Sequence, residues 1–315
     1  MKIIIKCYLT LVTFSNAVYG QDLKLFLVNY FPANANKPVG FISLSDIYPL
    51  NEHPDSLAIP DVEMMGIDSA NYFELNAEYR KRFLTSTGIS ESEKVFIYDY
   101  TNNIHFSFNV KELPVVACIN NYAGTDDWVF SQRDYMIGFE IDSIRLNDLS
   151  THYNTSLVYV GNEDPFVQNE MKPIVWKKIK HEKIPFSDKD LKSMPWLSRM
   201  NVGNTYKFET KEYQYFVQDL IQLDIINGRH LLIIDLKTNK PICERIFHDS
   251  EGTSLAPLNY ISPEYGNLLE QWTGNLFRNK APVVFGFLYL SFGCPAITFL
   301  DNSENDLYIG CDNRH

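Results

Sequence analysis

Strand-length apolar segments that flank short polar turns constrain the fold of this chain most strongly. Three such pairs occur, at residues 94–110, 231–247 and 296–310. Polar turns separate the two runs of each pair, and turn residues such as Asn tolerate the positive φ angles that tight hairpin turns need. The sequence therefore predicts three antiparallel hairpins.

Shorter segments of the same kind occur along the chain, and aromatic residues make up 14% of it. Aromatic and β-branched side chains favour the pleated, half-buried surface of a sheet. We therefore expect an all-β protein of mainly antiparallel strands with one or two helices. The shorter strands are expected at residues 25–30, 39–44, 115–119, 136–141, 157–160, 174–179 and 213–217.

Helical patterns are confined to a few segments. Ser262, Pro263 and Glu264 form a helix start signal before apolar residues at helical spacing, so we expect a helix from residue 263 to about residue 277. A second helix is expected near residues 73–84, where apolar residues recur at every fourth position. A short third helix is expected from Ser187 to just before Pro195.

Strands that end in an acidic residue before a turn recur at intervals of about 43 to 66 residues. Apart from the longest interval, which contains the expected helix, this spacing approaches that of one four-stranded propeller blade. A six-bladed β-propeller is therefore one hypothesis, and a β-sandwich or paired β-domains are the alternatives. No linker or change of composition marks a boundary, so we expect a single β-rich domain over residues 21–315. The acidic residues are Asp46, Asp99, Asp142, Asp188, Asp235 and Asp301.

The first 20 residues have the features of a secretory signal peptide. Lys2 precedes a short apolar region, and Val18 and Gly20 are modest or small residues before Gln21. The apolar region is shorter than the roughly 20 residues of a membrane span, and no later segment reaches that length. We therefore predict cleavage after Gly20 and a secreted or periplasmic protein without a transmembrane segment.

The charge of the chain and its missing motifs exclude several function classes. With 28 basic and 39 acidic residues, the formal net charge is −11, so nucleic acid is not an expected partner. The usual signatures of zinc, nucleotide and serine-hydrolase sites are absent, and we expect neither a metal nor a cofactor. Residues 301–312 imitate the donor spacing of a calcium loop, but Asp306 stands where the sharp turn needs glycine, so a polar hairpin turn explains them better.

Four cysteines remain once the signal peptide is removed. Cys294 and Cys311 flank the last expected hairpin at nearly opposite positions, which brings their Cα atoms within the range of a disulfide. We predict that these two residues are joined. Cys118 and Cys243 each lie within an apolar strand, where a buried thiol is the simpler interpretation.

Two polar loops are the best candidates for chemistry or binding. The first contains His248, Asp249 and Glu251, which place an imidazole beside carboxylates as general acid-base catalysis requires, and a solvated turn is the alternative. The second contains Asp126, Asp127 and Trp128, whose acids and indole suit contact with a sugar or a peptide. Its alternative is an ordinary loop with the Trp128 ring folded into the core.

Because no catalytic signature is found, the first functional hypothesis is a non-catalytic secreted β-domain that binds an unidentified ligand or protein partner through its loops. The alternative is a carbohydrate-active hydrolase or lyase, which needs two carboxyl groups about 5 to 10 Å apart in a cleft. A third hypothesis, a structural component of a cell-surface assembly, predicts a long unprotected edge strand. The sequence leaves the choice between enzyme and binding protein open, and no motif identifies a family.

Overall fold

The all-β prediction is confirmed. The computed structural model describes residues 23–32, 38–50, 58–120, 122–123, 128–142, 155–180, 184, 186, 188–261 and 269–312. In this part of the chain it has twenty-one strands and three short α-helices, and the strands form one nine-stranded, two five-stranded and one two-stranded sheet. The prediction that residues 21–315 form one domain stays a prediction.

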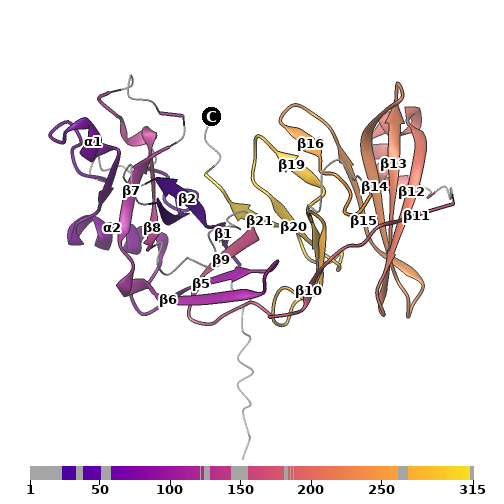
Figure 1. Ribbon diagram of the computed structural model, residues 1–315, viewed down its shortest axis with the longest axis horizontal. Helices are drawn as coiled ribbons and strands as arrows, with labels where there is room; N and C mark the ends of the chain where they lie inside the picture. The colour runs from indigo at the N-terminus through magenta and orange to yellow at the C-terminus, as the bar shows by residue number, and fades with distance from the viewer. Residues whose placement is uncertain are drawn as a thin grey trace, which may run out of the picture.

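One five-stranded sheet lies at one end of the long axis, in indigo and magenta at the left of Figure 1. Helix α2 lies beside it, and the short helix α1 precedes its strand β4 in the chain. In spatial order its strands are β2 (Asn29–Pro32), β3 (Pro38–Ser43), β8 (Tyr135–Ile141), β7 (Val115–Ile119) and β4 (Tyr72–Glu74), and the helices are α1 (Ile67–Ala70) and α2 (Ala77–Thr87).

Helix α2 shows how local sequence sets its boundaries. The Asn76 side chain accepts hydrogen bonds from the backbone N–H groups of Glu78 and Tyr79, at 3.0 and 3.2 Å, and so caps the first turn. Gly88 ends the helix in the left-handed conformation, with φ 72°. The helix expected near residues 73–84 therefore exists, but it begins four residues later because Tyr72–Glu74 pair with β7.

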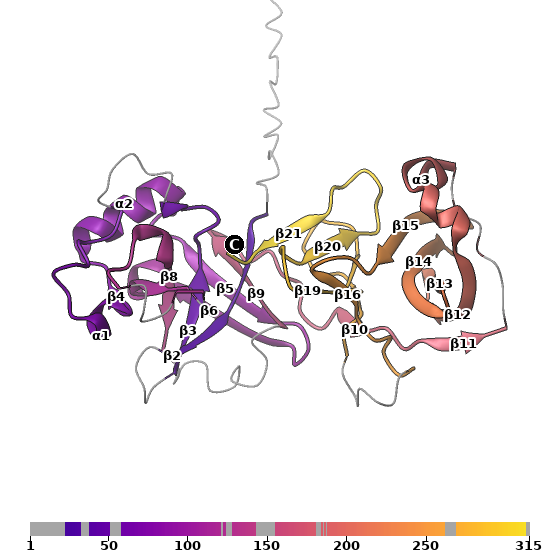
Figure 2. The ribbon, with the colours of Figure 1, turned by 90° about the horizontal axis from the view of Figure 1, so that it is seen from above.

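The nine-stranded sheet occupies the middle of the molecule in Figures 1 and 2. All of its pairs are antiparallel except the parallel pairing of β1 with β21, which joins the first described strand to the last. Its strands in spatial order are β10 (Met171–Pro173), β17 (Trp272–Gly274), β18 (Val283–Phe285), β20 (Ala296–Phe299), β21 (Leu307–Gly310), β1 (Leu25–Leu27), β9 (Ser156–Gly161), β5 (Lys94–Asp99) and β6 (Ile104–Asn109).

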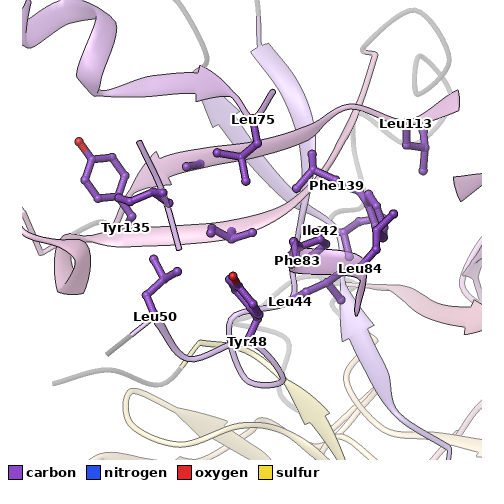
Figure 3. Packing of buried hydrophobic residues seen from close by; sticks show 14 of the residues in the cluster. Ile42, Leu44, Tyr48, Leu50, Leu75, Phe83, Leu84, Leu113, Tyr135 and Phe139 are labelled. Carbon is purple, nitrogen blue, oxygen red and sulfur yellow. The ribbon is translucent and has the colours of Figure 1, made fainter. Parts of the chain in front are cut away.

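The centre of this sheet is buried on both faces, which explains why β5 is apolar without alternation. Val95 and Ile97 belong to the core cluster of the N-terminal half, part of which is shown in Figure 3. Phe96 and Tyr98 point to the opposite face and join a second cluster built largely from the C-terminal strands. Side chains along a strand alternate between its two faces, so one strand contributes to two cores.

The second five-stranded sheet lies at the other end of the long axis and is strongly curled, as Figure 2 shows. Strands β16 (Thr253–Leu255) and β19 (Leu288–Leu290) form the small two-stranded sheet next to it. The short helix α3 (Asp188–Ser193) agrees with the third predicted helix. In order, the strands of the curled sheet are β11 (Lys177–Ile179), β12 (Asn201–Glu209), β13 (Tyr213–Gln222), β14 (Ile225–Asp235) and β15 (Lys240–His248).

All three predicted hairpins are confirmed, as the pairs β5–β6, β14–β15 and β20–β21. The sheets nevertheless differ from the six four-stranded blades that the spacing of acidic residues suggested. The Asp99, Asp235 and Asp301 carboxylates accept hydrogen bonds from backbone N–H groups two or three residues further on. Acids of this kind form hairpin turns in any β-rich fold, so their spacing does not indicate blades.

The helix expected at residues 263–277 is wrong over its described part. Residues 262–268 lie outside the described residues, and Trp272–Gly274 form strand β17 between β10 and β18. Apolar residues four apart also share one face of a strand, because four is a multiple of the two-residue period. Gly274 adopts φ 145°, and a Cβ there would lie 2.0 Å from the Glu170 carbonyl oxygen, so the backbone packs too closely for a side chain at that position.

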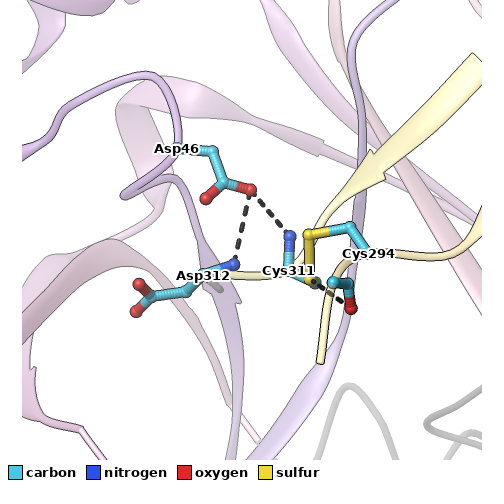
Figure 4. Close-up of a disulfide and its surroundings, with 5 residues drawn as sticks. Asp46, Cys294, Cys311 and Asp312 are labelled. Atoms are coloured by element: carbon cyan, nitrogen blue, oxygen red, sulfur yellow. Dashed lines mark hydrogen bonds between the residues drawn. A yellow bond between two sulfur atoms is a disulfide. The ribbon is translucent and has the colours of Figure 1, made fainter. Parts of the chain in front are cut away.

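The predicted disulfide between Cys294 and Cys311 is confirmed, with a Cα–Cα distance of 5.5 Å. Figure 4 shows the bridge beside Asp46, whose Oδ2 accepts the backbone N–H groups of Cys311 and Asp312, at 2.7 and 3.3 Å. The end of the described chain is therefore attached to the N-terminal half by these bonds as well as by the β1–β21 pairing. Cys118 and Cys243 are buried and lie outside the disulfide.

Candidate functional site

The predicted loop after β15 folds as a compact turn. Asp249 Oδ1 accepts the backbone N–H of Leu255 at 2.7 Å, and His248 Nδ1 lies 3.1 Å from the Asp249 carbonyl oxygen. The His248 imidazole therefore meets the backbone of Asp249, while the Asp249 carboxylate holds the turn. Glu251 is exposed. The role of His248, Asp249 and Glu251 in chemistry stays a prediction.

The second predicted loop is described only in part. Asp126 and Asp127 lie outside the described residues. Trp128 packs against the N-terminal core cluster, and its ring centroid lies 5.4 Å from that of Phe130 in an edge-to-face arrangement. The ring is partly buried and contributes to the core, as the alternative interpretation held.

The strongest surface feature is the tip of the hairpin between β13 and β14, which the sequence analysis did not single out. Ile221 pairs with Ile226 and Gln222 with Ile225, so Leu223 and Asp224 alone make the turn. Leu223 is 88% exposed, Ile225 64% and Ile226 38%. Soluble proteins rarely present neighbouring large aliphatic side chains at the end of a protruding element, and such features mark interaction sites.

The backbone of this tip is unusual for its residue types. Leu223 has φ 50° and Asp224 has φ 63°. Two central residues with positive φ are typical of a type I′ turn, which normally takes Asn-Gly. Leucine adopts positive φ only at some cost in free energy, so the turn would be more stable with other residues. The two turn residues give no turn signal, and the nearby Asn227-Gly228 dipeptide, a usual signal, lies within strand β14.

A polar turn and an exposed ring lie close to the arm of this hairpin. The backbone N–H of Asp249 donates to the Asn227 carbonyl oxygen at 2.9 Å, which places the predicted His248 turn beside the arm of the hairpin. Phe292 is 50% exposed and lies against Gly252, where an added Cβ would be 2.1 Å from the Phe292 ring. The hairpin therefore combines an apolar tip with a neighbouring aromatic ring and a polar turn.

A buried ion pair stiffens the base of the hairpin. Arg229 Nε on β14 lies 3.4 Å from Asp219 Oδ1 on β13, and Arg229 Nη1 donates to the Ala256 carbonyl oxygen. Tyr206 donates to Asp219 Oδ2 at 3.3 Å. Burial raises the pKa of Asp219 and lowers that of Arg229, while their mutual attraction opposes both shifts. The pair connects the hairpin to the segment after β16.

The opposite face of the same sheet holds a second buried polar group. His230 Nε2 lies 2.7 Å from Glu244 Oε1, and the Gln218 side chain donates to Thr205 at 2.8 Å. The Phe186 ring covers His230 at 4.9 Å between centroids. Because His230, Gln218 and Thr205 are fully buried, these contacts fit a role in positioning strands rather than in contacting solvent or ligand.

A pocket of about 240 Å³ lies away from this hairpin, between β1, the end of α2 and β9. Its lining mixes apolar and polar side chains and includes two charged ones. It contains one carboxylate, Glu93, whose Oε2 accepts the Ser90 backbone N–H at 2.8 Å. This pocket therefore lacks the pair of carboxylates that the hydrolase alternative requires. Its lining includes Phe26, Ile47, Ile89, Val160, Lys24 and Glu93.

No protein-family model matches the sequence, and neither characterised proteins nor solved structures give a significant match. Within the described ranges, no helix has the length and apolar character needed to cross a membrane. The same ranges contain no group of three or more His, Cys, Asp or Glu side chains placed to hold a metal ion.

Proposed function

We propose that this chain is a secreted or periplasmic, non-catalytic β-protein that binds a protein partner through the apolar tip of the β13–β14 hairpin. The tip is formed by Leu223, Asp224, Ile225 and Ile226. The single observation that carries the proposal is the exposure of three large aliphatic side chains at the end of the β13–β14 hairpin.

The chemistry of the tip favours a protein over a lipid surface. Asp224 lies between Leu223 and Ile225 and is itself exposed. A carboxylate at the centre of an inserting turn is costly in the apolar part of a bilayer. The net charge of −11 also opposes approach to anionic lipid. A protein pocket with an apolar floor and a basic rim satisfies both the aliphatic side chains and the carboxylate.

The backbone of the tip supports a functional reason for its sequence. A Leu at positive φ lowers stability, and its exposed side chain gains nothing from burial within the chain. Burial of Leu223 against a partner takes its side chain out of water. The free energy gained in this way offsets the cost of the positive φ angle. Aliphatic anchors of this kind commonly carry much of the binding free energy at the centre of an interface.

Export is supported by two features. Residues 1–20 have the charge and apolar pattern of a signal peptide, and the Cys294–Cys311 disulfide is typical of proteins in oxidising compartments.

Photo-crosslinking in the native compartment tests the proposal. A photoreactive amino acid at position 223 is expected to give covalent adducts with a protein. The matched control places the same group at Lys237, an exposed residue in the turn at the opposite end of the same sheet. Adducts from both positions in equal yield, or from neither, would contradict binding through the tip.

A further inference from the structure

Resting on the proposed binding through the tip, we propose that the partner is a second copy of this chain. Leu223 of one copy enters the pocket between β1, α2 and β9 of the next. Copies would then associate head to tail.

The size and lining of the pocket fit one aliphatic anchor. Its volume of about 240 Å³ exceeds the roughly 150 Å³ of an apolar cavity that holds one benzene, and it falls below the about 300 Å³ at which sites for drug-sized ligands begin. A leucine side chain with part of its turn occupies a space of that order. Its apolar lining comes from Phe26, Ile47, Ile89 and Val160, beside the polar side chains of Thr87 and Tyr159.

Of the two charged side chains that line the pocket, Lys24 is complementary in charge to Asp224 of the tip. Lys24 is exposed at the rim of the pocket, and no carboxylate of the described residues forms an ion pair with it. Asp224 follows Leu223 directly, so it lies at the rim when Leu223 is inside. The carboxylate that Asp224 must avoid is Glu93, which is held toward the turn at Ser90 by its hydrogen bond. Lys24 and Asp224 thus set the orientation of the tip in the pocket.

The positions of the two surfaces determine the kind of assembly. The tip lies at the free end of the curled sheet, whereas β1 and β9, which line the pocket, belong to the nine-stranded sheet in the middle of the molecule (Figures 1 and 2). A contact between two different surfaces of one chain is heterologous and generates a ring or an open filament rather than a two-fold dimer. An open assembly keeps one free tip at one end and one free pocket at the other until it closes.

Strand pairing at a sheet edge is the other route to self-association. Edge strand β15 carries Lys240, Glu244 and Arg245, and charged side chains disfavour edge-to-edge pairing. The contact of a tip with a pocket is smaller than the about 1,200 to 2,000 Å² of stable interfaces, so assembly should depend on concentration.

Sedimentation velocity of the mature chain over a concentration series tests the inference. The key variant is Leu223→Asn, because asparagine accepts positive φ and preserves the turn while removing the apolar anchor. We expect it to weaken association by about 30-fold, the effect of removing one hot-spot residue. The control Leu236→Asn changes a partly exposed leucine in the turn at the other end of the sheet and should leave association unchanged.

Charge exchange and mixing test the pairing itself. Lys24→Glu and Asp224→Lys should each weaken association, and the double variant should restore it relative to either single change. A mixture of Leu223→Asn and Lys24→Glu proteins should form one-to-one dimers and nothing larger, because together they offer one intact tip and one intact pocket.

The outcomes separate this inference from the proposed function. A chain that sediments as a monomer at all concentrations, or association insensitive to Leu223→Asn, overturns the inference. If the crosslinker at position 223 joins a different protein, binding through the tip holds and self-association fails. If the adducts contain peptides around Lys24, Ile89 or Val160 of this chain, both hold.

Discussion

Removal of the disulfide by the double variant Cys294→Ser/Cys311→Ser tests how the end of the chain is held. The bridge closes a loop of 17 residues, for which the chain-entropy model gives about 3 kcal/mol of stabilisation. At about 2.1 cal/mol/K per residue, the unfolding entropy of a chain of about 295 residues is about 0.6 kcal/mol/K, so the expected loss in Tm is roughly 5 °C. The bonds from Asp46 go to backbone N–H groups and remain possible in the variant.

Differential scanning calorimetry of the parent and the variant, with and without reductant, measures this effect. The difference in Tm should vanish when both proteins are reduced, because the cross-link is then absent from both. The control Asp46→Ala removes the bonds to Cys311 and Asp312 but keeps the cross-link, so its loss of stability should persist in reductant. A Tm difference below about 2 °C without reductant, or one that survives reduction, would refute the reasoning.

Three further predictions concern buried groups and processing. Arg229→Ala should lower the free energy of unfolding in urea by about 3 to 5 kcal/mol at neutral pH, because Asp219 becomes an unpaired buried charge. Burial already raises the pKa of Asp219, and Arg229→Ala removes an attraction that lowers this pKa. The folded variant therefore binds a proton at Asp219 more readily than the folded parent, so the loss of unfolding free energy should shrink as the pH falls. A loss of unfolding free energy that grows at low pH would contradict this reasoning. Trp272→Ala should cost about 3 to 5 kcal/mol in the same assay, since the ring is buried against Tyr100, and a cost below about 1 kcal/mol would show that the ring is not packed as described. Mass spectrometry of exported protein should find Gln21 as the first residue, whereas an intact segment 1–20 would disprove cleavage there.

The features predicted correctly from the sequence are local ones. Hairpins such as β5–β6 combine a turn with apolar strands in one short segment, and the disulfide follows from the geometry of the last hairpin. Helix α2 was placed four residues too early because the β4 strand next to it depends on pairing with β7, which is distant in sequence. Strand β17 was mistaken for a helix for the same reason, since its pairing with β10 and β18 decides its structure.

The candidate site could not be predicted because its defining property is exposure. Leu223, Ile225 and Ile226 look in the sequence like core residues of a strand, and the Leu-Asp turn lacks the usual Asn or Gly. Only the register of β13 against β14 shows that they lie at a free end. Asp249 is an example of a residue that the sequence suggested for chemistry. In the structure its carboxylate accepts a backbone hydrogen bond and so holds a turn.

Hydroxyl-radical footprinting of the tip tests the central claim most directly. The oxidation rates of Leu223 and Ile225 would be measured in the native compartment and in dilute purified protein, with Leu236 as the internal reference. Binding through the tip predicts that Leu223 and Ile225 are protected in the native compartment while Leu236 is unchanged. Equal oxidation of Leu223 under both conditions would contradict the claim that this tip is a binding surface.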